Sequence, residues 1–195
     1  MKLITIEGQL RSEFGKKASR HIRSEGKVPC VIYGGSSNIH FTTTPKELKA
    51  IVYTPEFNKA IIKIDGKEYT CILKDLQMHK TTDEVTHVDF LELVSGKRLN
   101  ANVPLRFVGQ STGVKSGGRF VIKMNTIKVR TTPENLSSHI DVDITNLEIG
   151  KNLRIEDVVV ANTEIMHNKR IPIAAVVTTR ALKQEATEAA KADKK

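Results

Sequence analysis

The dipeptide Asp65-Gly66 constrains the fold of this chain more than any other short feature, because it separates two strand-like runs at residues 60–64 and 67–74. Asp-Gly favours a tight primed turn, so the two runs predict an antiparallel hairpin. Further strand-like segments lie around it, at residues 2–10, 28–35, 38–44 and about 84–94. The first half of the chain therefore predicts a small closed sheet.

The strand predicted at residues 84–94 has two chemically different faces. Val88 and Phe90 share one face, whereas His87 and Asp89 lie on the other. Because side chains alternate across a strand, we expect the polar pair to face outward.

A short basic helix is predicted to begin at Gly15 and to end at Gly26, with Pro29 just beyond. Ala18 and Ile22, four residues apart, provide a small apolar foot for packing on the sheet. Four basic residues at spacings i, i+4, i+7 and i+11 line another face: Lys16, Arg20, Arg23 and Lys27.

A second helix is predicted from Thr44-Pro45-Lys46-Glu47, which has the pattern of a capping box with proline at the first helical position. Residues 48–53 continue the helix, and Pro55 marks its end.

The pattern changes after Ser95, where residues 95–98 read as a linker. Beyond them, strands separated by Gly-rich or Pro-containing turns are predicted at residues 102–109, 118–123, 125–131, 139–145 and 172–179. Residues 108–118 are expected to form a flexible loop, and the outward side chains of the following strands include Lys123, Lys128 and Arg130. The prediction is a mainly β chain with two domains, residues 1–93 and 94–180, and a flexible Ala/Lys/Glu tail at 181–195.

Charge and apolar content limit the class of protein. A net charge of +9 and a pI near 9.6 favour an anionic partner, either nucleic acid or a membrane surface. The chain contains no apolar run long enough to span a bilayer and no secretory leader, so we expect a cytosolic protein. Cys30 and Cys71 lie in apolar strands and are expected to be buried thiols, without a disulfide or zinc.

The basic charge is concentrated in residues 11–35, which hold six basic and two acidic residues. A solvated helix face is one interpretation. The other is a phosphate-binding surface, favoured because Lys16 and Arg20 repel each other by roughly 0.2–0.5 kcal/mol and because the arginine fork suits phosphates and guanine edges.

Two catalytic interpretations are weaker. The loop after Gly109 lacks the P-loop spacing, since Val114 stands where a second glycine is required. His79, His87 and Asp89 lack a second group of ligands, so a catalytic metal site or a nuclease is not supported. We expect no cofactor and no small-molecule substrate.

The pattern Arg11-x3-Gly15-Lys16-x2-Ser19-Arg20-x2-Arg23, followed by Gly26-Lys27-x-Pro29 and Val31-Ile32-Tyr33-Gly34, resembles the opening of the bacterial large-subunit ribosomal protein L twenty-five family. Lys74-Asp75-x-Gln77 and His87-Val88-Asp89-Phe90 resemble the second half of that family's RNA-binding domain. The total length resembles its long two-domain form, the Ctc general stress protein type. His21 departs from the family, which more often carries another basic residue at that position.

The resemblance implies a small N-terminal β-barrel that binds 5S ribosomal RNA and helps to support the central protuberance of the large subunit, among other rRNA and ribosomal proteins. It also implies that His87 and Asp89 contact bases or sugars, and that Tyr33 contacts RNA. The alternatives are a non-ribosomal RNA-binding stress protein or RNA chaperone, and an RNA-processing enzyme. The full set of expected RNA-binding residues is Arg11, Lys16, Lys17, Ser19, Arg20, Arg23, Tyr33, Lys74, Gln77, His79, His87 and Asp89.

Overall fold

The structure, a computed structural model, describes residues 1–160 and 162–179. The chain forms two compact units, one of residues 1–102 with 130–138, the other of residues 103–129 with the described residues from 139 onward. The Ala/Lys/Glu tail predicted at 181–195 lies outside the described residues. In the part of the chain that is described, no helix is long and apolar enough to cross a membrane.

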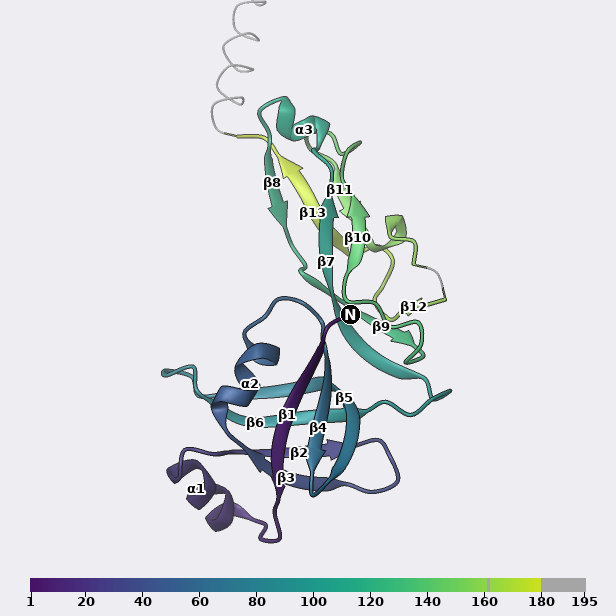
Figure 1. The fold of residues 1–195 in the computed structure, drawn as a ribbon. Helices are drawn as coiled ribbons and strands as arrows, with labels where there is room; N and C mark the ends of the chain where they lie inside the picture. The colour runs from purple at the N-terminus through teal and green to yellow at the C-terminus, as the bar shows by residue number, and fades with distance from the viewer. Residues whose placement is uncertain (161, 180–195) are drawn as a thin grey trace, which may run out of the picture. The chain divides into compact units, whose positions relative to one another are not determined.

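The first unit is a closed six-stranded barrel, which confirms the predicted fold class (Figure 1). The strands lie in the order β1-β3-β2-β6-β5-β4 around the barrel. Their bounds are β1 (Leu3–Leu10), β2 (Val28–Tyr33), β3 (Ile39–Thr43), β4 (Lys59–Ile64), β5 (Lys67–Met78) and β6 (Val85–Glu92). β1 pairs with β4 and β2 pairs with β6 in parallel, whereas the remaining neighbours are antiparallel.

The predicted hairpin is formed by β4 and β5, which pair antiparallel. Asp65 and Gly66 both have positive φ, 47° and 80°, as a primed turn requires. The inward side chains fill the barrel, and several are 0% exposed: Ile6, Ile32, Phe41, Ile62, Val88 and Phe90. For the strand predicted at residues 84–94, the alternation in the sequence therefore identified the core face, that of Val88 and Phe90, correctly.

Both predicted helices of this unit are present, as α1 (Lys16–Ser24) and α2 (Pro45–Val52). The predicted capping box is wrong: Thr44 occupies the N-cap position, but within the described residues its side chain makes no capping hydrogen bond. Pro45 presets the first helical turn, and the burial of Leu48 and Ile51 holds the helix on the barrel. The helix therefore forms without the cap.

The second half of the chain contains two small sheets, of order β10-β7-β9-β12 and β11-β13-β8. The bounds are β7 (Leu99–Val108), β8 (Arg119–Ile122), β9 (Thr126–Thr131), β10 (Ile140–Asp143), β11 (Asn152–Arg154), β12 (Glu164–Ile165) and β13 (Pro172–Val177). A 3-10 turn at Ile155–Asp157 follows β11. β11 and β12 were not predicted, because strands of three and two residues are too short to show a period.

The flexible loop predicted at residues 108–118 is a wrong prediction, because it contains the short helix α3 (Thr112–Lys115). The Ser111 hydroxyl accepts from the Val114 N–H, and the Gly113 N–H donates to the Leu147 carbonyl at 2.9 Å. A Cβ at Gly113 would come within 2.7 Å of the backbone of Glu148. The glycine that suggested a flexible loop is therefore needed here because only a residue without a side chain allows the backbones to pack this closely.

Candidate nucleic-acid interface

Helix α1 lies on the barrel surface and presents its basic residues to solvent. The helix begins after Gly15 and ends before Gly26, as predicted from the sequence, and both glycines have positive φ, 100° and 74°. Ala18 and Ile22 are only half-buried, and no residue of the helix is fully buried. Packing alone therefore attaches this helix weakly. Lys16, Lys17 and Arg20 are exposed, and their contacts with RNA stay a prediction.

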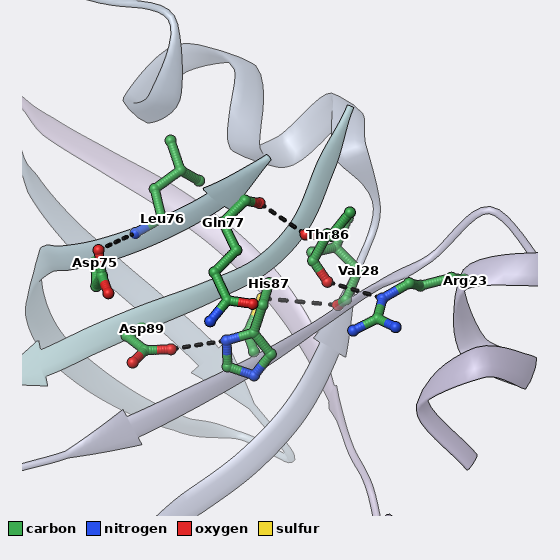
Figure 2. Close-up of polar contacts among 9 residues, drawn as sticks. Arg23, Val28, Asp75, Leu76, Gln77, Thr86, His87 and Asp89 are labelled. Atoms are coloured by element: carbon green, nitrogen blue, oxygen red, sulfur yellow. Dashed lines mark hydrogen bonds and ion pairs between the residues drawn. The ribbon is translucent and has the colours of Figure 1, made fainter. Parts of the chain in front are cut away.

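Arg23 connects the helix to strand β6. Its Nε donates to the backbone carbonyl oxygen of Thr86 at 3.0 Å (Figure 2). The N–H donors of a guanidinium lie on more than one edge of its plane. Because this bond uses Nε, the two terminal nitrogens can still donate to another partner. The bond brings the basic helix face next to the strand that carries His87 and Asp89.

His87 and Asp89 lie on the same outward face of β6, as the alternation predicted (Figure 2). The His87 Nδ1 and Asp89 Oδ1 atoms are 2.7 Å apart, and the two side chains are 28% and 31% exposed. A carboxylate this close fixes the orientation of the imidazole ring. On the neighbouring strand β5, Gln77 pairs with His87 and Asp75 pairs with Asp89, so the four polar residues form one patch.

Tyr33 ends β2 beside this patch. Partial burial, followed by the negative charges of Asp89 and Asp75, raises the pKa of the Tyr33 phenol above its ordinary value. The phenol therefore keeps its proton at neutral pH and can donate a hydrogen bond. The structure thus brings together Tyr33, Gln77, His87 and Asp89, which come from three strands.

The loop before α1 contains an aromatic residue that the sequence reasoning missed. Phe14 is 61% exposed, and its ring forms a T-shaped pair with His40 at a centroid distance of 4.9 Å. The Arg11 guanidinium lies 5.5 Å from the Phe14 ring centre and also approaches the Ser19 hydroxyl at 3.5 Å. An aromatic residue inside the basic run of residues 11–23 was the available signal.

A lateral row of residues joins this loop to the polar patch. His40 on β3 pairs with Val31 on β2, and Val31 pairs with Asp89 on β6. Asp89 in turn pairs with Asp75 on β5. The loop and the patch are therefore connected by paired residues on neighbouring strands of the barrel.

Two predicted site residues have structural roles of their own. The Lys74 Nζ donates to the Asn100 carbonyl at 2.8 Å. The His79 Nδ1 accepts from the N–H groups of Thr81 and Thr82 at 3.4 and 3.3 Å, in the turn after β5. His79 also lines a groove of about 450 Å³ that includes Arg23.

His21, the position that departs from the family pattern, contacts Glu25 one turn later, with 3.3 Å between Nε2 and Oε1.

Cys30 and Cys71 are buried free thiols, as predicted. Burial raises the pKa of both thiols, that of Cys71 to about 12. Neither is therefore suited to act as a thiolate ligand or nucleophile at neutral pH. No group of three potential metal ligands occurs among residues 1–160 and 162–179.

The first unit is a closed barrel with a basic helix beside a patch of polar side chains that can hydrogen-bond to sugars and bases. This arrangement fits the class of β-barrel proteins that bind nucleic acid. Two family models match the chain: the Ribosomal L25p family over residues 6–90, and Ribosomal protein TL5, C-terminal domain, over residues 98–180. The chain belongs to the Ribosomal L25p family and has its long two-domain form, which confirms the resemblance found in the sequence. This is a family of structural proteins rather than enzymes.

Individual relatives match along almost the whole chain. The Large ribosomal subunit protein bL25 of Cytophaga hutchinsonii is 38% identical, over 98% of this chain and 100% of the relative. The protein of the same name from Amoebophilus asiaticus is 36% identical over 97% and 96%. That of Porphyromonas gingivalis is 32% identical over 96% and 99%.

Proposed function

We propose that this chain is a structural constituent of the large ribosomal subunit in the cytoplasm, where it associates with rRNA and ribosomal proteins. Its N-terminal domain, residues 1–93, binds 5S ribosomal RNA and thereby supports the central protuberance. The observation that carries the proposal is the Arg23 to Thr86 hydrogen bond, which holds a basic helix beside the His87 and Asp89 pair. The names of the relatives, all large-subunit proteins, support the ribosomal part.

The two parts of the site have different chemical tasks in this proposal. Arg11, Lys16, Arg20 and Arg23 contact phosphates, which gives affinity without sequence preference. Tyr33, Gln77, His87 and Asp89 contact sugars and base edges. An A-form helix has a deep, narrow major groove, so such contacts require a region where non-canonical pairs open the groove. Asp89 accepts from a base amino group, because a carboxylate would repel phosphates.

The test is a filter-binding titration of the full chain with 5S rRNA over a range of salt concentrations. We expect wild-type protein to prefer 5S rRNA over another RNA of equal length. Arg20→Ala should weaken binding to all RNAs and reduce the slope of log K against log salt by about 0.7–0.9, the share of one phosphate. Lys123→Ala, which removes an exposed charge from the second half of the chain, is the control and should leave the slope unchanged.

Two results contradict the proposal. One is an equal slope for Arg20→Ala and wild type, which removes the phosphate contact. The other is the absence of a preference for 5S rRNA in the wild type. Sedimentation with the large subunit in a sucrose gradient separates a ribosomal constituent from an RNA chaperone.

Asp89→Asn is expected to reduce discrimination between wild-type 5S rRNA and variants of its internal loop by about 5- to 150-fold, with little change in salt slope. The substitution replaces an acceptor by a partial donor, and one base contact is worth about 1–3 kcal/mol of discrimination. Competition binding with a set of RNA variants measures the effect. Asp65→Asn is the matched control, because Asn-Gly suits the same turn. Unchanged discrimination in Asp89→Asn would remove the base contact.

A further inference from the structure

Phe14 is an apolar ring held on a charged surface. It is 61% exposed, whereas Phe41 and Phe90 of the same unit are 0% exposed. The residues around it in the sequence are polar or charged: Arg11 and Glu13 stand before it, and Lys16 and Lys17 after it. Burial in the core therefore does not account for this side chain.

The ring is held in a defined orientation although it is exposed. His40, a residue of β3, packs against it in a T-shaped arrangement at an interplanar angle of 66°. Arg11 lies 5.5 Å from its centre and is itself fixed by a 3.0 Å hydrogen bond from Nε to the Glu13 carbonyl. A partner that stacks on this ring meets a preorganised surface, which reduces the entropy lost on binding.

Flat aromatic and guanidinium surfaces next to basic residues bind unstacked nucleobases. Stacking accepts any base, because every base has a π face. We propose that Phe14, together with Arg11 and His40, is a stacking platform for an unpaired base of the bound RNA. The inference rests on the proposed function, since it adds a base contact at the far end of the row that runs through His40 and Val31 to Asp89.

The chain has no tryptophan, so Phe14→Trp introduces a single reporter at the platform. We expect its fluorescence to be quenched when 5S rRNA is added to the full chain. Leu3→Trp is the matched control, because Leu3 is 58% exposed at the opposite end of β1 and should not be quenched. The Phe14→Trp variant should bind at least as tightly as wild type.

Phe14→Ala should weaken 5S rRNA binding by about 5- to 150-fold. Phe14→Leu should also bind more weakly than wild type, because leucine keeps the apolar bulk but has no π face. If wild type binds 5S rRNA but Phe14→Ala binds equally well, and the fluorescence of the Phe14→Trp variant is unchanged by RNA, the platform is overturned while the proposed function stands. If wild type does not bind 5S rRNA, the proposed function fails and the platform fails with it. A blue shift of the reporter on phosphatidylglycerol vesicles, without quenching by RNA, would assign Phe14 to a membrane surface and overturn the inference.

Discussion

Phe90→Ala is expected to lower the free energy of unfolding of the barrel by about 3–5 kcal/mol. Phe90 is 0% exposed and packs against Phe41 with 6.0 Å between ring centres. Removing the ring leaves a cavity that the six strands can fill only in part, because the closed sheet restricts their movement. Phe90 also follows Asp89 in β6, so the loss of packing is expected to disturb the polar patch.

The effect can be measured on the full chain by urea unfolding. All three tyrosines, Tyr33, Tyr53 and Tyr69, lie in the first unit, so tyrosine fluorescence reports the unfolding of that unit alone. Phe14→Ala is the matched control, since it removes the same ring from an exposed position and should change stability by less than about 0.5 kcal/mol. Equal stability losses in the two variants would contradict the assignment of Phe90 to the core.

The features that were predicted correctly from the sequence are set by local chemistry. The Asp65-Gly66 turn depends on two residues that tolerate positive φ, and the ends of α1 depend on Gly15 and Gly26. The inward and outward faces of β6 follow from alternation alone. Such features need no knowledge of the rest of the chain.

The features that were missed depend on contacts between distant segments. The parallel pairs β1 with β4 and β2 with β6 join strands that are not consecutive, and no local pattern specifies them. The hydrogen bond from Lys74 to Asn100 and the order of the loop around Gly113 likewise depend on partners elsewhere. Phe14 was missed because a phenylalanine in a sequence is first assigned to the core. Its exposure appears only when the barrel is closed.

Arg23→Lys is expected to weaken 5S rRNA binding by about tenfold, nearly as much as Arg23→Ala, whereas Arg20→Lys should stay within about twofold of wild type. At Arg20 the exposed side chain supplies a charge, which lysine retains. At Arg23 the guanidinium holds Thr86 through Nε, and its other edge remains available for a phosphate. A lysine ammonium is a single point and cannot place donors on two opposite edges.

The measurement is a binding titration of the Arg23 and Arg20 variants, each to lysine and to alanine, at fixed salt, combined with amide hydrogen exchange of α1 in the free protein. Since α1 buries no residue, loss of the Arg23 to Thr86 bond should speed exchange in this helix for both Arg23 variants and for neither Arg20 variant. Faster exchange with unchanged binding would show that Arg23 positions the helix without contacting RNA. Wild-type binding together with wild-type exchange in Arg23→Lys would contradict both roles, because the attachment of the basic helix to β6 would then not depend on the guanidinium.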